Sequence, residues 1–156
     1  MKHNLGFRPV NAGDYPLIMA WRSNPLVYQH YYQQDAPLVW GEHLEWWESR
    51  NEDWMAWMVL YGTDGSWRPV GVLSIGQLDS WQPDIGIFVG EVTLWGTGVG
   101  KDILSFGTQY LMAHKYHSAR ATIKPDNIGS IKIFEYFIFE KVCESRNGED
   151  LYIARW

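Results

Sequence analysis

The sequence predicts an α+β fold (mixed α/β) in which about four helices flank one central, mostly antiparallel sheet of about six to seven strands. Short apolar segments bounded by turn residues indicate the strands. Other segments repeat apolar residues every three or four positions, which is typical of helices. The length of 156 residues fits a single domain over residues 1–156.

The N-terminal half contains signals for two helices and three strands. Proline fits the first turn of a helix but not its interior, so Pro16 marks the start of the first helix and Pro25 its end. The second helix repeats Trp40, His43 and Trp47 on one face. The elements expected are a strand at Leu5–Val10, a helix from Asp14 to Pro25, a loop at Asn24–Leu38, a helix at Val39–Arg50, and hairpin strands at Trp54–Tyr61 and Pro69–Ile75 joined through Gly62–Gly65.

The C-terminal half contains the most apolar strand. Asp84–Val89 is nearly all apolar, so we expect a central strand there. Cys143 falls in a predicted strand, where we expect a small buried hydrophobic residue and not a nucleophile. The other elements expected are a helix at Gly98–Lys115, a strand at Ala119–Lys124, a helix at Asn127–Phe137, and strands at Phe139–Glu144 and Leu151–Arg155 flanking a turn at Asn147-Gly148.

Composition and charge argue against several classes of partner. The net charge of −5 disfavours nucleic acid as the main partner. No apolar run reaches the roughly 20 residues of a membrane helix, and the first residues lack a secretory signal. We therefore expect no membrane partner and a cytoplasmic location. The histidines show no metal-ligand spacing, so no metal site is expected.

Aromatic residues make up 16% of the chain, including 10 Trp and 9 Tyr. Such side chains usually fill cores, but they also bind flat-faced ligands and gather at protein interfaces. Exposed tryptophans would favour a homodimer. The composition leaves these uses open.

A glycine-rich loop precedes the longest predicted helix. Gly96, Gly98 and Gly100 alternate with other residues, which lets the backbone adopt positive φ and approach a ligand closely. The N-terminus of the following helix offers unpaired N–H groups, so the loop suits a phosphate or pyrophosphate. Neither the Walker nor the Rossmann pattern is present. On the loop alone, a purely structural turn is an equal alternative.

A second motif gives the loop a more specific meaning. The run Asn127–Lys141 resembles the N-x-x-S-x-x-x-Y/F-E-x-x-x-F segment of the GNAT superfamily of acetyl-CoA-dependent acetyltransferases. The glycine loop resembles the R/Q-x-x-G-x-G/A loop of that superfamily, with Trp95 where Arg or Gln is usual. The order of elements is similar over almost the whole chain. The resemblance implies an acyltransferase enzyme with acetyl-CoA as donor, and no metal.

The resemblance implies which residues hold the coenzyme. The loop amides would bind its pyrophosphate, and the central strand would pair with its pantetheine arm. Asn127 matches a residue that commonly contacts that arm. The coenzyme-binding residues implied are Ile87, Phe88, Val89, Trp95, Gly96, Thr97, Gly98, Val99, Gly100, Lys101, Asn127, Ser130 and Phe134.

The catalytic residues are less well determined. Phe134 occupies the position where many relatives carry the Tyr that protonates the leaving thiolate. Tyr136 is a candidate, although it is turned by about 200° around the helix and a packed or half-exposed aromatic is the alternative. Glu91, just past the central strand, is the first candidate for the base, with a solvent-exposed loop charge as the alternative. Asp84, Glu42 and His43 are further candidates.

The first two helices would form the acceptor side. The Trp21-Arg22-Ser23-Asn24-Pro25 start and the later Glu42-His43-Leu44 are similar to acetyltransferases of nucleotide-linked amino sugars. N-terminal acetylation of a ribosomal protein, acetylation of aminoglycosides or polyamines, and a non-catalytic acyl-CoA-binding module remain alternatives. The residues expected to bind the small-molecule amine are Trp21, Arg22, Tyr28, Glu42, His43 and Trp47.

Overall fold

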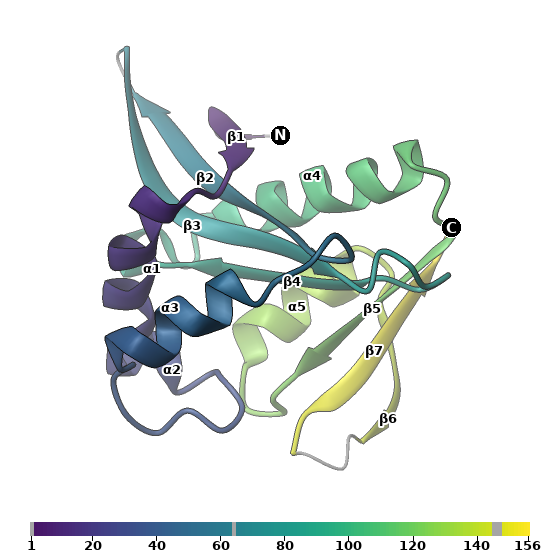
Figure 1. The fold of residues 1–156 in the computed structure, drawn as a ribbon. Helices are drawn as coiled ribbons and strands as arrows, with labels where there is room; N and C mark the ends of the chain where they lie inside the picture. The colour runs from purple at the N-terminus through teal and green to yellow at the C-terminus, as the bar shows by residue number, and fades with distance from the viewer. Residues whose placement is uncertain (1, 64, 145–147) are drawn as a thin grey trace.

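The computed structural model describes residues 2–63, 65–144 and 148–156. They form a seven-stranded sheet in the order β1-β2-β3-β4-β5-β7-β6 (Figure 1). The neighbouring strands run antiparallel, except that β4 and β5 run parallel. The strands are β1 (Leu5–Pro9), β2 (Met55–Thr63), β3 (Ser66–Gly76), β4 (Asp84–Val89), β5 (Ser118–Ile123), β6 (Glu140–Glu144) and β7 (Asp150–Arg155).

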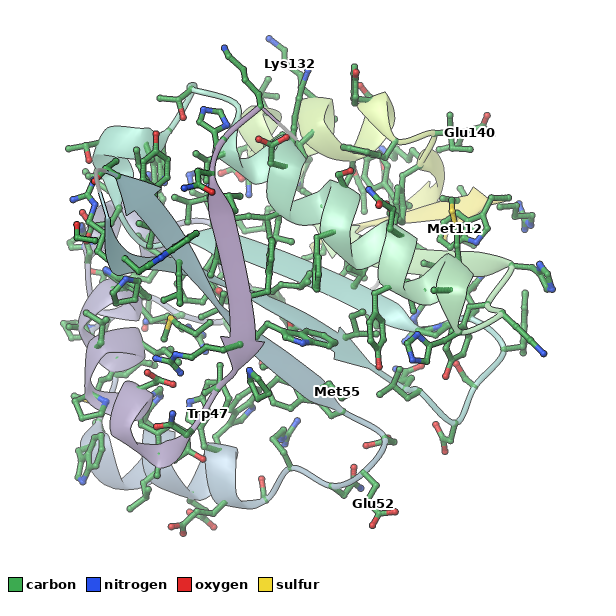
Figure 2. The ribbon with its side chains drawn as sticks, turned by 90° about the horizontal axis from the view of Figure 1, so that it is seen from above. Trp47, Glu52, Met55, Met112, Lys132 and Glu140 are labelled. Atoms are coloured by element: carbon green, nitrogen blue, oxygen red, sulfur yellow. The ribbon has the colours of Figure 1, made fainter. Side chains whose placement is uncertain are left out.

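Helices pack on both faces of the sheet. The α-helices of the described residues are α1 (Tyr15–Arg22), α2 (Pro25–Tyr28), α3 (Trp40–Glu48), α4 (Val99–Ala113) and α5 (Ile128–Tyr136), with 3-10 turns η1 (Ala12–Asp14) and η2 (Val92–Leu94). Seen from above, Met112 of α4 and Trp47 of α3 lie on opposite sides of the sheet (Figure 2). The site described below therefore has helices on both of its walls.

The larger core lies between the sheet and the helices α4 and α5. Leu104 and Leu111 of α4 pack against Leu73 of β3 and Ile85 of β4, and all four are essentially inaccessible to water. Gly107 lets α4 lie close to the sheet, because a Cβ there would meet the Ile85 Cδ1 atom at 2.7 Å. Burial of this apolar surface fixes α4 over the middle of the sheet.

A second core joins α1 and α3 to the opposite face. Ile18 and Trp21 of α1 and Trp47 of α3 pack with Met58 of β2 and Val72 of β3. Two of these side chains, Trp21 and Trp47, belong to the large aromatic fraction of the chain. Some of the tryptophans are therefore core residues, as the usual role of aromatic side chains predicts.

An ion pair joins β1 to the start of α1. The Arg8 guanidinium donates from Nη1 and Nη2 to the two carboxylate oxygens of Asp14, each over 2.7 Å. Asp14 also completes a capping box with Asn11 around η1. Hydrogen bonding from Arg8 lowers the pKa of the Asp14 carboxyl, because the bond favours the ionised form.

Two expectations were wrong. The segment Asn24–Leu38 is not a loop throughout, because Pro25–Tyr28 forms α2 and the Asn24 side chain caps it by accepting from Leu26 N over 3.0 Å. Four residues are too few to show a helical period. Cys143 is exposed instead of buried, because β6 is the edge strand and all five of its residues are exposed.

Most of the remaining elements match the expectation. The β2–β3 hairpin and the central place of β4 are confirmed. Asp64 in the hairpin turn and Asn147 in the last expected turn lie outside the described residues. The single-domain assignment stays a prediction. Within the described residues, none of the helices has the length and apolar character needed to cross a membrane.

We expect Leu111→Ala to lower the free energy of unfolding by about 2–5 kcal/mol, because it opens a cavity in the larger core. The adjacent Met112 is 46% exposed on the same helix, so Met112→Ala should change stability by no more than about 0.5 kcal/mol. Urea unfolding of both variants measures the difference. Equal losses would contradict the packing of α4 described here.

Candidate active site

The sheet opens between its two parallel strands. In the described residues, β4 and β5 share one register pair, Asp84 with Arg120, whereas β3 pairs with β4 over six positions from Gly71 to Gly76. Beyond this pair the two strands diverge (Figure 1), and no register pair joins β4 to β5 in the described residues after Asp84. A strand edge of this kind presents N–H and C=O groups that an extended chain can pair with.

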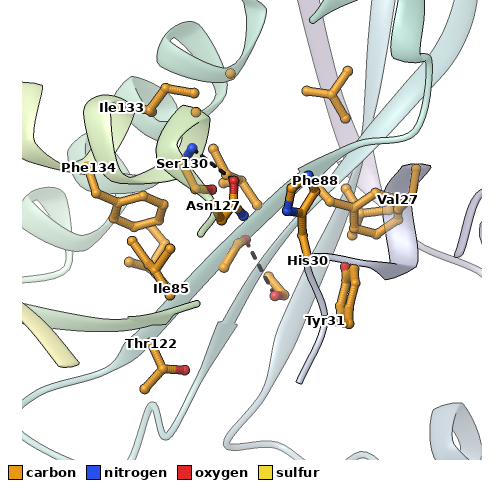
Figure 3. A pocket seen from close by; sticks show the side chains of 18 of the residues that line it. Val27, His30, Tyr31, Ile85, Phe88, Thr122, Asn127, Ser130, Ile133 and Phe134 are labelled. Atoms are coloured by element: carbon orange, nitrogen blue, oxygen red, sulfur yellow. Dashed lines mark hydrogen bonds between the residues drawn. The ribbon is translucent and has the colours of Figure 1, made fainter. Parts of the chain in front are cut away.

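A cavity of about 860 Å³ occupies this opening. In Figure 3, Phe134 and Ser130 of α5 line one side, and His30 and Tyr31 line the other, while Thr122 of β5 lies at the lower left. The size is adequate for a substantial ligand, since small-molecule sites usually span about 300–1,000 Å³. The cavity is therefore the candidate active site.

The cavity brings together many of the residues singled out from the sequence. Those that line it are Arg22, Trp47, Ile87, Phe88, Val89, Trp95, Gly96, Gly98, Gly100, Lys101, Asn127, Ser130 and Phe134. Those that do not line it are Trp21, Tyr28, Glu42, His43, Glu91, Thr97, Val99 and Tyr136. Apart from Thr97 and Val99, the second set belongs to the acceptor and catalytic candidates.

The glycine loop forms one end of the cavity. Gly96 and Gly98 have φ of +75° and +103°, a conformation that side chains with a Cβ rarely adopt. The indole Nε1 of Trp95 donates to Val89 O over 2.8 Å, which ties the loop to the end of β4. Gly98 is the N-cap residue of α4 and lines the cavity together with Gly100, so the start of the helix lies at the cavity. Lys101 N already donates to Gly98 O over 3.0 Å.

An acidic side chain anchors α4 from behind this loop. Asp102, in the first turn, accepts from Lys2 N, His3 N and His3 Nδ1 with its Oδ2 atom, each over 2.8 Å. Burial opposes ionisation of Asp102, yet the bonds from His3 and Lys2 lower the pKa of its carboxyl. These contacts hold the start of α4 in place.

The start of α5 forms the neighbouring wall. Asn127 caps α5, because its Oδ1 accepts from Ser130 N over 3.2 Å, and both residues line the cavity. Phe134 is 3% exposed and packs edge-on against Phe139 at 5.0 Å between ring centroids. The spacing of Asn127 and Ser130 thus has a structural cause, a helix cap, besides any contact with a ligand.

Aromatic side chains and an arginine form the opposite wall. The Arg22 guanidinium lies 4.0 Å above the centre of the Tyr31 ring, and its Nη2 donates to Gln34 Oε1 over 3.0 Å. Burial raises the pKa of Tyr31 to about 12, although the Arg22 charge lowers it in part. Trp47 packs edge-on with Trp46 and Trp54, which also line the cavity.

Several cavity residues were not found from the sequence. His30, Tyr31, Trp54 and Glu149 come from segments far apart in the chain, and no motif marks them. The pKa of His30 is lowered mainly by burial, so its imidazole is neutral near pH 7. These side chains come together only in the folded protein, where the segment after α2 and the residue before β7 both lie at the opening between β4 and β5.

The acceptor candidates outside the cavity have structural contacts. His43 is 5% exposed, and its Nε2 is 2.9 Å from the backbone oxygen of Tyr15, which joins α3 to α1. Trp21 donates from Nε1 to the Glu91 carboxylate over 3.3 Å. Tyr136 is 66% exposed, and Lys101 Nζ lies 4.0 Å from its ring centre.

No group of three or more His, Cys, Asp or Glu that could hold a metal ion occurs within residues 2–63, 65–144 and 148–156.

Two comparisons lead to Methanocaldococcus jannaschii. The uncharacterized protein MJ1062 is 41% identical over 145 residues, which is 93% of this chain and 30% of that protein. This chain therefore spans less than a third of the curated relative it matches. The crystal structure of a domain from the same organism has a TM-score of 0.95 at 38% identity, covering 99% of this chain and 100% of that chain.

More distant likenesses concern the fold alone. Spermidine N-acetyltransferase from Vibrio cholerae, solved with CoA and spermine, has a TM-score of 0.76 at 13% identity. The match covers 96% of this chain and 92% of that chain.

A family model identifies the domain. Residues 4–139 of the present sequence match the acetyltransferase (GNAT) domain. Together with the fold and the position of the cavity, that match shows that this chain belongs to the GNAT acetyltransferase domain family.

Proposed function

We propose that this chain transfers the acetyl group of acetyl-CoA directly to a primary amine of a nucleotide-linked amino sugar. One observation carries the proposal: a single cavity extends from the glycine loop at the start of α4 into the opening between β4 and β5. The loop amides suit a diphosphate, and the β4 edge suits an extended arm. An acyl carrier bound this way has its thioester deep between the strands.

In this arrangement the protein holds the coenzyme through its backbone. The amides of Gly98 and Gly100, which line the cavity, bind the diphosphate, and the strand Ile87–Val89 pairs with the pantetheine arm. A backbone N–H of that strand stabilises the oxyanion that forms as the amine attacks the thioester carbonyl. Asn127 and Ser130 border the arm, and the helix dipole of α4 adds attraction for negative charge.

The reaction needs no enzyme-bound acyl intermediate. The amine nitrogen forms a bond to the carbonyl carbon while the C–S bond breaks, and CoA leaves as a thiolate. Phe134 has no proton to give, so water protonates the thiolate, whose thiol has a pKa of about 8.5. Cys143 lies on the edge strand β6 and does not line the cavity, which agrees with direct transfer.

The acceptor wall supports an amine that also carries negative charge. Arg22 provides a guanidinium beside the Tyr31 ring, a combination that suits a phosphate next to a flat ring. A polyamine or an aminoglycoside carries several positive charges, which Arg22 would repel. The free N-terminus of a ribosomal protein would lack the phosphate.

The test is release of free CoA thiol by the purified chain with acetyl-CoA and a panel of amines. We expect turnover with a nucleotide-linked amino sugar, and slower turnover with spermidine, an aminoglycoside or a peptide with a free N-terminus. Binding of acetyl-CoA in calorimetry without thiol release from any amine would favour a non-catalytic acyl-CoA-binding module instead.

Replacement of Gly98 by valine should abolish coenzyme binding, because a β-branched residue does not tolerate φ of +103° and would displace the loop amides. Gly65 also has positive φ, at +84°, but lies in the β2–β3 hairpin. Gly65→Val is thus a control for backbone strain alone and should keep acetyl-CoA affinity. Calorimetry with acetyl-CoA measures both variants, and unchanged affinity in Gly98→Val would exclude the loop from the coenzyme site.

Replacement of Arg22 by alanine should raise KM for the nucleotide-linked amino sugar by about tenfold or more, since a charge-assisted hydrogen bond contributes roughly 1.5–3 kcal/mol. The dissociation constant for acetyl-CoA should stay the same, because Arg22 lies on the opposite wall. Steady-state kinetics with an amino sugar that carries no phosphate provide the comparison. If KM rises equally for both acceptors, Arg22 does not bind a phosphate.

A further inference from the structure

We propose that Glu149 is the general base that takes the proton from the attacking amine, an inference that rests on the proposed function. Glu149 immediately precedes β7 and lines the cavity together with Gly86 of β4 and Thr122 of β5. The sequence offered Glu91 for this role. The structure puts a different carboxylate on the wall of the opened sheet.

The direction of the cavity places the reacting atoms near Glu149. One part of the cavity is lined by the glycine loop and by the end of β4 at Val89, where the diphosphate binds. An arm that follows the β4 edge from Val89 toward Gly86 approaches the only described β4–β5 pair, Asp84 with Arg120. Its acyl end therefore reaches the part of the cavity that Thr122 and Glu149 line (Figure 3 shows Thr122).

The surroundings suit Glu149 to accept a proton. Burial raises the pKa of its carboxyl, and the negative charge of Asp84 raises it further, while the Thr122 hydroxyl and the Lys124 charge lower it in part. Asp84 is itself held by Arg120, at 3.4 Å from Nε. A base with a raised pKa takes a proton from an ammonium group more readily, and its charge attracts that group.

Two other groups compete for the role. The Glu91 carboxylate accepts a hydrogen bond from Trp21 Nε1 and does not line the cavity. His30 lines the cavity, but its ring lies 6.0 Å from that of Trp95, which belongs to the glycine loop. His30 is therefore near the glycine loop, whereas the Glu149 carboxyl lies by Thr122 of β5.

The proton balance of the step is simple. The ammonium group of the acceptor gives one proton to the Glu149 carboxylate and becomes a neutral amine. The nitrogen then forms the amide bond and the C–S bond breaks. The second N–H proton lost on amide formation leaves to solvent with the departing thiolate, and Glu149 releases its own proton to water before the next turnover.

The test compares pH–rate profiles of Glu149→Gln, Glu149→Asp and the unaltered chain, using thiol release. Activity needs the carboxylate, so the unaltered chain should lose kcat/KM as pH falls through the pKa of Glu149. Glu149→Gln should lower kcat by about 100-fold or more and lack this acid limb. Glu149→Asp should restore part of the rate and the limb. Acetyl-CoA affinity should be equal in all three.

Two further variants separate a base from a merely structural residue. Asp84→Asn removes the neighbouring negative charge, which lowers the pKa of Glu149, so the acid limb should move to lower pH. Glu140 is exposed on β6, and Glu140→Gln makes the same change of charge outside the cavity, so its profile should equal that of the unaltered chain.

The outcomes are distinguishable. An acid limb that persists in Glu149→Gln, or that disappears instead in Glu91→Gln or His30→Asn, overturns the assignment to Glu149. If the unaltered chain binds acetyl-CoA but acetylates no amine, the proposed function fails before any variant is measured, and the role of Glu149 fails with it.

Discussion

β4 and β5 pair at Asp84 and Arg120 and then diverge, and the rest of the molecule is arranged around that divergence. Parallel strands need a long crossover, and here α4 supplies it. Gly107 lets α4 lie so close to Ile85 that the helix covers one face of the sheet and leaves the opening free. If the two strands stayed paired along their length, the cavity would close and the edge of β4 would have no groups to offer.

The loop before α4 must keep one conformation for its amides to point into the opening. Trp95 holds it to β4 through Val89, and Asp102 holds the start of α4 to His3 and the N-terminal strand. Trp95 stands where Arg or Gln is usual in similar loops, and its indole donates a hydrogen bond within the protein, to Val89 O. A site that binds through backbone amides depends on such tethers, because preorganised donors need not reorganise during the reaction.

From the sequence we predicted those parts of the candidate site that lie within short, continuous motifs. Gly98 and Asn127 belong to short motifs in which backbone conformation and helix capping restrict the residue types, so their place in the site could be inferred from the resemblance of these motifs to those of a known family. His30 and Glu149 belong to segments more than a hundred residues apart, and only the folded sheet brings both to one cavity. Periodicity failed at α2 and at Cys143, because a single helical turn has no period and an edge strand can be exposed on both faces.

Different parts of the cavity favour different charges on a bound molecule. The start of α4 and Lys101 favour negative charge at the coenzyme end, and Arg22 favours it on the acceptor wall. Glu149 also lines the cavity, close enough to Asp84 for that charge to raise the pKa of its carboxyl, and in the proposed function it favours positive charge near the thioester. A molecule with an ammonium group at one end and a phosphate at the other satisfies both Glu149 and Arg22, whereas a polycation satisfies only Glu149. If the proposed function holds, this arrangement of charge selects for the orientation of the acceptor as well as for its binding, since the reverse orientation would bring like charges together.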